Sequence, residues 1–197
     1  MPLFRKKPPK HLPLETQLQI LAANGINLLP GRTIDDLLVS FPREEYETLP
    51  YNLLLIMLGT EVEDESGRNF TDNVCSFDAE CIEDTGDYAR KIQRLAEIAG
   101  GDLPIEDIRD AIDVDAGTAR IECTLDGRTH EFEPRFDDDW FDPEVIDWLE
   151  QLLTSRGSTR RFFLYDSGDQ NIVVLCTTPH LITKLVKATG LQFHRTN

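Results

Sequence analysis

The feature that most constrains the fold is a plan that occurs twice in the second half of the chain: two strand-like runs joined by a turn, followed by an amphipathic helix. In residues 119–156, Asp126-Gly127 separates two alternating runs, which is the strongest short-range signal of a β-hairpin. In residues 161–190, two apolar runs flank a longer turn, Asp166-Ser167-Gly168-Asp169-Gln170. Because hairpin strands pair antiparallel, the repeated plan predicts an α+β fold with helices packed on a mainly antiparallel sheet.

The short turn also predicts the register of the first hairpin. It places Leu125 opposite Arg128, Cys123 opposite His130, and Ile121 opposite Phe132. Both runs of the second hairpin are apolar on both faces, so we expect them to be central strands that are covered on both sides. Asp142 with Pro143 and, later, Pro179 mark the expected starts of the two helices.

An N-terminal helical segment precedes these units. Leu14–Asn24 carries leucines at helical spacing, and Thr33 followed by Asp36 is typical of a helix start. The apolar run Leu53–Leu58 fits either a buried strand or a helix. Its single β-branched residue, between a proline and a glycine, favours the helix.

The stretch 73–101 reads as a strand followed by a helix. Hydrophobic residues alternate from Val74 to Ile82, which places Asp78 and Glu80 on the face opposite the core. Asp84 or Thr85 is the expected cap of the following helix. The next run, Leu103–Ile112, is predicted to be a short helix, with Asp102 as its possible cap.

We divide the chain into a flexible basic leader, residues 1–12, and one α+β domain, residues 13–197. The longest apolar run has far fewer than the roughly 20 residues that a membrane-spanning helix needs. The basic start has no apolar segment behind it of the kind that a secretory signal requires. The four cysteines contain no Cys-x-x-Cys pair, so we expect reduced thiols and a cytoplasmic location.

Charge is distributed very unevenly along the chain. The formal net charge is −16, yet residues 61–150 hold 28 acidic and 8 basic residues, while residues 151–197 are net positive. Such a field repels the phosphates of nucleic acids and anionic membrane surfaces, and attracts basic proteins. We therefore expect a basic protein partner, with no nucleic acid and no membrane as partners.

Asp78 and Glu80 are the first candidate for chemistry, because alternation puts both carboxylates on one side of a strand. The tetrapeptide Phe77-Asp78-Ala79-Glu80 resembles the strand motif of two-metal exonucleases of the DnaQ-like type. In that family an Asp-x-Glu pair holds Mg²⁺ ions that activate water. The resemblance covers only these four residues. A metal-dependent hydrolase or nuclease using Asp78 and Glu80 is therefore an alternative, and we predict no catalytic residue, metal ligand or cofactor.

The preferred interpretation is an acidic protein-binding module. Asp137-Asp138-Asp139 stands beside Trp140, and acids beside an exposed aromatic residue are typical of a surface that anchors a basic partner. The predicted partner-binding residues are Asp78, Glu80, Asp137, Asp138, Asp139 and Trp140. Bacterial immunity-type proteins, which neutralise basic toxins or nucleases, resemble this chain in their size, acidity and α+β character.

Two further interpretations stay open. The acidity can also be explained by solubility alone, in which case the chain is a structural domain of unknown function. In the basic C-terminal part, Arg160-Arg161 and His180 could form a small anion site at the start of a helix.

Overall fold

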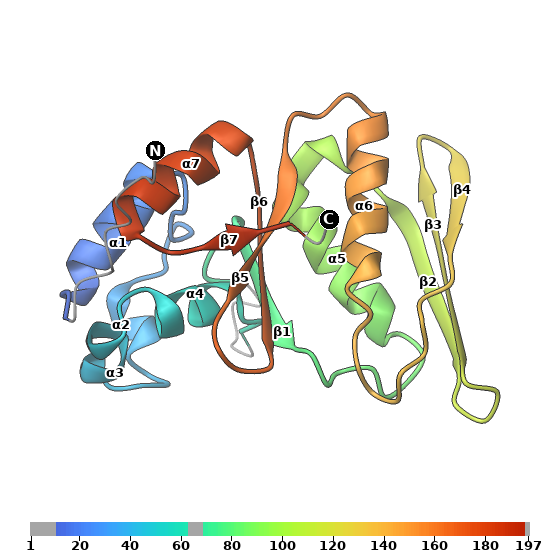
Figure 1. Cartoon of the computed structure of the whole chain (residues 1–197), viewed down its shortest axis with the longest axis horizontal. Coiled ribbons are helices and arrows are strands. Elements are labelled where there is room, and N and C mark those ends of the chain that lie inside the picture. The colour runs from blue at the N-terminus through green and yellow to red at the C-terminus, as the bar shows by residue number, and fades with distance from the viewer. Residues whose placement is uncertain (1–10, 63–68, 196–197) are drawn as a thin grey trace, which may run out of the picture.

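One four-stranded antiparallel sheet with two apolar faces organises the fold. A computed structural model describes residues 11–62 and 69–195. Apart from His11 and Leu12, the predicted leader lies outside the described residues. The division of the chain at residue 12 therefore stays a prediction. The strand order is β1-β6-β5-β7 (Figure 1). The strands are β1 (Val74–Asp78), β5 (Arg161–Asp166), β6 (Asn171–Thr177) and β7 (Phe193–His194).

The two faces of this sheet belong to two separate hydrophobic cores. Alternate side chains of β1, β5 and β6 enter one core: Cys75, Phe77, Phe162, Val174 and Cys176. The intervening side chains enter the other: Val74, Phe163, Val173 and Leu175. The prediction that the strands of the second hairpin are central and doubly covered is confirmed.

The first core is closed by two helices and a second sheet. These elements are α5 (Asp87–Ala99), the 3₁₀ turn η1 (Gly100–Asp102), α6 (Glu144–Ser155), and the strands β2 (Glu106–Asp113), β3 (Thr118–Leu125) and β4 (Arg128–Phe132). The helices α5 and α6 lie between the two sheets (Figure 1). The predicted register of the β3–β4 hairpin is confirmed at all three pairs. The fold is thus α+β and antiparallel as predicted, but its strands form two sheets.

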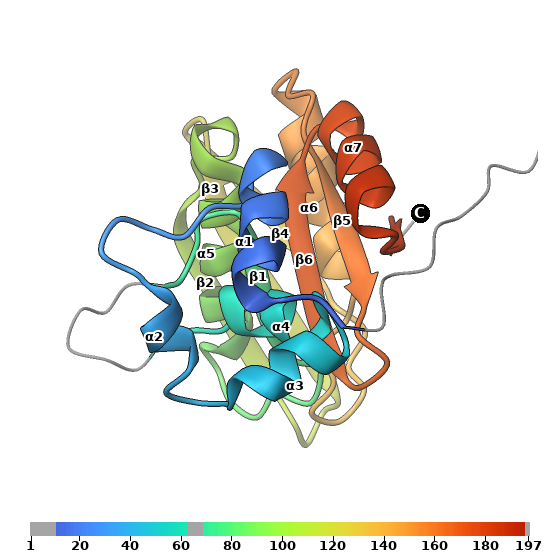
Figure 2. The same cartoon turned by 90° about the vertical axis from the view of Figure 1, so that its left-hand side faces the viewer.

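The second core lies under the N-terminal helices and α7 (Figure 2). These helices are α1 (Leu14–Ala23), α2 (Ile34–Leu37), α3 (Arg43–Thr48), α4 (Asn52–Gly59) and α7 (Pro179–Thr189). The run Leu53–Leu58, which fitted helix or strand, lies within α4. The predicted capping box of Thr33 and Asp36 is present at the start of α2.

A fully buried glutamine joins the N-terminal helices to one another. The Gln17 amide nitrogen donates to the carbonyls of Leu12 and Tyr46, each at 2.8 Å, and its oxygen accepts from the Tyr51 amide at 2.7 Å. Tyr51 has the left-handed backbone conformation, with φ of 71°. Because all the hydrogen-bonding capacity of a buried group must be met, Gln17 fixes this strained residue at the start of α4. No helix among the described residues is long and apolar enough to cross a membrane.

The prediction of a short helix at Leu103–Ile112 is wrong, because this segment contains strand β2. Its pairing with β3 shifts between Glu106 and Arg109, where Asp107 has φ of 50°. This bulge adds one residue, so the inward-facing Ile105 and Ile108 are three apart instead of two. The bulge therefore gives the apolar residues of this strand a spacing that is also typical of a helix.

Two smaller expectations near β1 are also wrong. The strand ends at Asp78, and the residues up to Ile82 bond to other segments. The cap of α5 is Gly86, whose amide donates to Asp110 Oδ1 of β2 at 2.7 Å. Burial raises the pKa of Asp110. Hydrogen bonds from the backbone amides of Gly86 and Tyr88 partly offset this rise. A side chain from another strand thus replaces the expected local cap.

Replacing Gly59 by alanine should destabilise the protein. A Cβ atom at Gly59 would lie 2.6 Å from the Ser76 backbone nitrogen and 2.7 Å from the Cys75 carbonyl carbon. Because these atoms belong to the backbone of a buried strand, they cannot move aside cheaply, and we expect a loss of about 2 kcal/mol in the free energy of unfolding. Urea denaturation followed by circular dichroism measures this loss.

Gly101→Ala is the matched control, since a Cβ atom there would meet nothing within 4 Å. It should change the free energy of unfolding by less than about 0.5 kcal/mol. Equal effects of the two substitutions would contradict the close approach of α4 to β1.

Candidate functional site

The predicted partner-binding residues come together at one end of the four-stranded sheet. The segment after β1, the segment between β4 and α6, and the turn between β5 and β6 meet at the lower end of the molecule in Figure 1. We call Asp78, Glu80, Asp137, Asp138, Asp139 and Trp140 together the acidic rim. About 60 residues of sequence separate its two parts, 78–80 and 137–140. The sequence alone therefore did not show that they are neighbours.

Backbone hydrogen bonds join the two parts of the acidic rim directly. Glu80 and Trp140 form an isolated antiparallel bridge. The Phe141 amide donates to the Ala79 carbonyl at 2.8 Å. The Asp139 carbonyl accepts from the amides of Cys81 and Ile82, each at 2.9 Å. The positions of the carboxylates are therefore set by paired backbone rather than by free loops.

A third segment completes the arrangement through Gln170. The Ala79 amide donates to the Gln170 carbonyl at 2.9 Å. The Gln170 side-chain amide lies 2.9 and 3.0 Å from the Asp78 oxygens and 3.5 Å from Glu80 Oε2. Asp78 and Glu80 thus face the same side, as alternation predicted. Gln170 carries no signal in the sequence that points to this site, because only the pairing of Asp78 with Asn171 brings it there.

An aromatic cluster supports the rim from beneath. The ring of Phe141 lies 5.0 Å from that of Phe77 and 5.4 Å from that of Tyr88, between ring centroids. The Tyr88 hydroxyl accepts from the Asp142 amide at 3.1 Å. Asp142 is buried, and its carboxylate accepts from the amides of Arg135 and Glu144. Packed rings and satisfied buried groups hold the rim in one shape.

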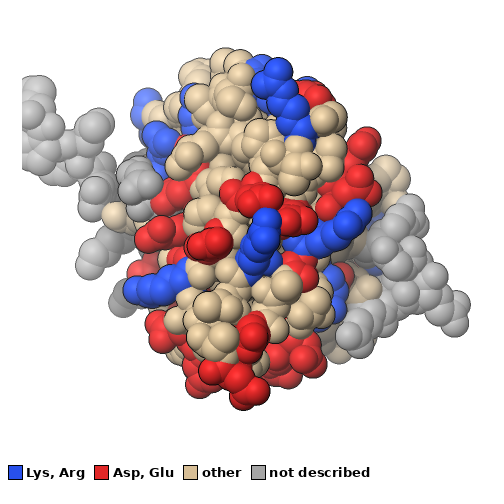
Figure 3. Space-filling model, turned by 90° about the vertical axis from the view of Figure 1, so that its right-hand side faces the viewer, with Lys and Arg blue, Asp and Glu red and all other residues tan. Residues whose placement is uncertain are grey.

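The rim presents both charge and an aromatic ring to solvent. Asp78, Glu80, Asp137 and Asp138 are exposed, and Trp140 is 43% exposed. Asp138 has φ of 55°, within a turn closed by the Trp140 amide and the Asp137 carbonyl. Acidic side chains also gather toward the same end on the face shown in Figure 3.

Little of this charge is neutralised locally. Arg135 lies 3.6 Å from Asp137, and both side chains are largely exposed, so this ion pair contributes little. Among the described residues, Asp78, Glu80, Asp138 and Asp139 form no salt bridge. The rim can therefore attract cationic groups from solution.

The described residues contain no group of three or more His, Cys, Asp or Glu side chains that could hold a metal ion. Tyr165 in β5 and Asp169 in the following turn have a Tyr-x-x-x-Asp spacing of the kind that some two-metal exonucleases use. The Asp169 carboxylate instead accepts from Ser167 and Asn171 and closes the turn. The geometry of the described residues therefore does not support the alternative of a metal-dependent hydrolase or nuclease that uses Asp78 and Glu80.

Searches of protein-family models, curated proteins and solved structures found no match to the chain.

The cysteines have the environment of inert thiols. Burial raises the pKa of Cys75 to about 12, and that of Cys81, Cys123 and Cys176 to about 11, from an ordinary value of 9.0. Since the thiolate is the nucleophile, these groups are protonated and unreactive near neutral pH. Cys81, which is half-buried beside the rim, is the most accessible of the four.

Labelling of the thiols by an aromatic disulfide reagent at about pH 8 should be slow in the native protein. Two units of pKa reduce the thiolate fraction about a hundredfold, so each native thiol should react at least about a hundredfold slower than in urea. Cys81 should react first, and Cys81→Ser should remove that phase. A native thiol that reacts at the unfolded rate would contradict the assigned environments.

Proposed function

We propose that this chain is a protein-binding module whose acidic rim captures a basic protein. An immunity or inhibitor protein that neutralises a basic toxin or nuclease is the specific form of this proposal. The observation that carries it is the junction of Glu80 with Trp140, which unites two separate acidic segments around one exposed aromatic ring.

The two components of the rim would serve different stages of binding. Unpaired surface carboxylates steer a basic partner toward the site and raise the association rate. A large aromatic side chain at the centre of an interface typically carries much of the affinity and slows dissociation. The rim combines both within one rigid surface, which lowers the entropy lost on binding.

The same charges disfavour the alternatives among macromolecules. Asp137, Asp138 and Asp139 would repel a phosphate backbone, and the few basic groups nearby, such as Arg135, are already close to acids. A structural domain that is acidic only for solubility would not need an exposed tryptophan among the acids. These points support the basic partner without identifying it.

Reversing three charges of the rim should slow partner capture. In the variant Asp137→Lys, Asp138→Lys and Asp139→Lys, the attraction becomes repulsion, so we expect the association rate to fall at least about tenfold. The immobilised wild-type chain is used to capture proteins from a lysate of its source, and the bound protein is identified by mass spectrometry. Association and dissociation are then followed with that purified protein at several salt concentrations.

The matched control is Asp35→Lys, Glu44→Lys and Glu45→Lys, which makes the same change in net charge on exposed residues of α2 and α3. It should retain capture. If both triple variants bind alike, or if the captured protein is not basic, the rim is not the interface. An affinity that does not weaken with added salt would also count against charge steering.

Trp140→Ala should act on a different step. Truncation of a central interface aromatic typically costs about 2 kcal/mol, so the dissociation rate should rise about thirtyfold while the association rate and its salt dependence stay unchanged. The melting temperature should change little, because the Trp140 side chain is 43% exposed. Phe141→Ala is not a suitable control, since that ring is buried under the rim. Unchanged dissociation would show that Trp140 lies outside the interface.

A further inference from the structure

The outer edge of strand β4 is open. Along this strand, Arg128, His130 and Phe132 alternate with Thr129 and Glu131. Because the turn before β4 has two residues, the first set exchanges the ladder hydrogen bonds with β3. The backbone N–H and C=O groups of Thr129 and Glu131 therefore point away from β3. Both residues are exposed, and within the described part of the chain these groups have no hydrogen-bond partner.

The opposite edge of the same sheet is covered by the start of α5. The Ile112 amide of β2 donates to Thr85 Oγ1 at 3.2 Å, and the Asp110 carboxylate accepts from the amides of Gly86 and Tyr88. An uncovered edge is a template for pairing with a further strand, and proteins usually cover or shorten such edges. Of the two edges of this sheet, that of β4 is thus available for pairing.

A groove of about 590 Å³ lies beside this edge, over the exposed stripe of α6. Phe132 of β4 and Trp148 of α6 line it, with their rings stacked at 5.5 Å between centroids. Leu164 of β5 adds a further apolar side chain. A strand added to β4 would direct every second side chain to the same side as Phe132, and so into the groove. The apolar lining suits the aliphatic stem of a long side chain.

Acidic side chains of α6 also line the groove. Glu144 is exposed and Asp147 is half-buried. Burial, followed by the charges of Glu150 and Glu144, raises the pKa of Asp147, so a cation beside it would favour its charged form. The basic groups of the lining are His194 and Arg195, and Arg195 forms an ion pair with the buried Glu150. The groove therefore favours a side chain with an apolar stem and a cationic end.

The charges beside the edge select the kind of strand that can pair with it. Glu131 and Glu133 are exposed on β4 and directly after it, and Glu131 forms an ion pair with Arg120. The chain then continues into the acidic rim at Asp137. A second copy of β4 would bring these glutamates, and those of the groove, toward like charges, which is unfavourable. A basic strand has the opposite charge and could reach the rim as well.

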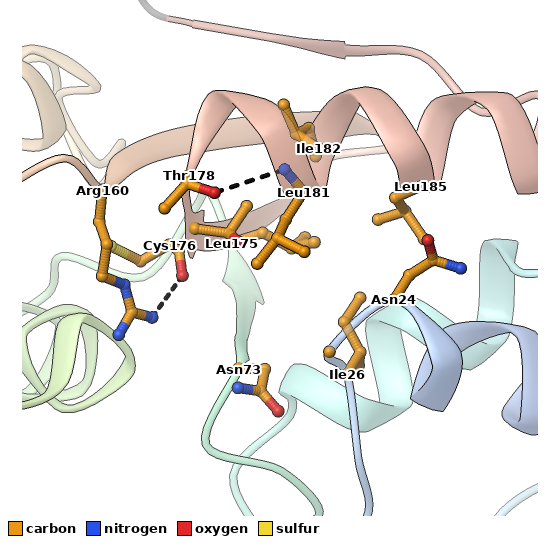
Figure 4. Close-up of a pocket in the computed structure, with 12 residues that line it drawn as sticks. Asn24, Ile26, Asn73, Arg160, Leu175, Cys176, Thr178, Leu181, Ile182 and Leu185 are labelled. Atoms are coloured by element: carbon orange, nitrogen blue, oxygen red, sulfur yellow. Dashed lines mark hydrogen bonds between the residues drawn. The ribbon is translucent and has the colours of Figure 1, made fainter.

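A smaller cavity of about 250 Å³ lies against α7 and shares no lining residue with the groove (Figure 4). Its guanidinium, that of Arg160, already donates to the carbonyls of Ile98 and Cys176. Arg161 and His180 do not line this cavity, so the three residues do not form the anion site considered from the sequence. The groove beside β4 is thus the larger hollow and the one that adjoins an open strand edge.

We infer, on the basis of the proposed function, that the edge of β4 binds an extended segment of the basic partner as an additional antiparallel strand. Backbone bonds to Thr129 and Glu131 would supply affinity. Lysine or arginine side chains at alternate positions would lie in the groove, with their stems over Trp148 and their charged ends beside Glu144 and Asp147. Such a site recognises a short basic segment with a β-strand pattern.

A short capped peptide that alternates arginine with valine tests the site on the full chain, by calorimetry and by amide shifts in ¹⁵N-labelled protein. With the arginines in the groove, the valines lie opposite Thr129 and Glu131 and form the backbone bonds. We expect shifts at these two residues and along the exposed stripe of α6. A peptide with glutamate in place of arginine should bind at least about tenfold more weakly.

N-methylation of the peptide distinguishes strand addition from attraction between charges. Methylated valines lose the amide protons that face β4, so binding should weaken at least about tenfold. Methylated arginines should bind within about threefold of the parent peptide, because their amides face solvent in the paired strand. The two methylated peptides carry the same charge.

Two pairs of variants locate the binding on the chain. Glu131→Pro removes one outward amide and none of the ladder bonds, so it should weaken peptide binding about tenfold, whereas Glu131→Gln keeps the amide and should change binding less than about threefold. Circular dichroism checks that the proline variant is folded. Glu144→Lys should also weaken binding about tenfold, and Glu106→Lys, on exposed residue 106 of β2, is its matched control.

The inference is overturned if the arginine peptide does not bind, if the glutamate peptide binds equally well, or if methylated valines bind as tightly as methylated arginines. Peptide binding to folded Glu131→Pro at the wild-type affinity would overturn it too. So would a dimer of the free chain that Glu131→Pro dissociates, because the edge would then serve a second copy.

Failure of this inference differs from failure of the proposed function. If the peptide does not bind while reversal of Asp137, Asp138 and Asp139 still slows capture of the protein partner, strand addition is wrong and the rim remains the interface. If the peptide binds as expected while that reversal has no effect, the edge of β4 binds basic strands and the rim is not the interface.

Discussion

The burial of one sheet on both of its faces is the constraint on which the rest of the structure depends. Apolar side chains alternate between two cores along β1, β5 and β6, so neither face of the sheet can be left in water. Helices from both ends of the chain cover one face, and two helices backed by a second sheet cover the other. The acidic rim lies at one end of these strands, beyond the end of β1 and the start of β6.

The acidity of the chain has two physical origins that composition cannot separate. Four buried or nearly buried carboxylates accept hydrogen bonds from backbone amides and belong to the architecture: Glu47, Asp87, Asp142 and Glu150. In the rim, Asp78, Glu80, Asp137 and Asp138 are exposed and Asp139 is half-buried. Among the described residues, the backbone amide bonded to these carboxylates is that of Glu80, which donates to Asp78. The large charge of residues 61–150 is therefore partly structural, and only the exposed part is available to a partner.

The sequence predicted the elements whose residues interact locally. The Asp126-Gly127 turn predicted its hairpin and register, and the run Leu53–Leu58, for which a helix was favoured, lies within α4. Features that depend on distant contacts were not predictable. In β2, Asp110 occupies an inward position because it accepts from amides at the start of α5, and together with the bulge it hid the alternation of a strand. Gln170 reached Asp78 only through the pairing of β1 with β6.

The bridge between Glu80 and Trp140 has a consequence for how the rim could be recognised. The rim is discontinuous in sequence: its members come from two segments that only the folded chain brings together. A linear peptide copied from residues 76–82 or 135–141 would carry the charges without their arrangement. An unfolded or truncated chain would likewise present no competing copy of the surface. Recognition of the rim would therefore report the native state, much as an antibody against a conformational epitope does.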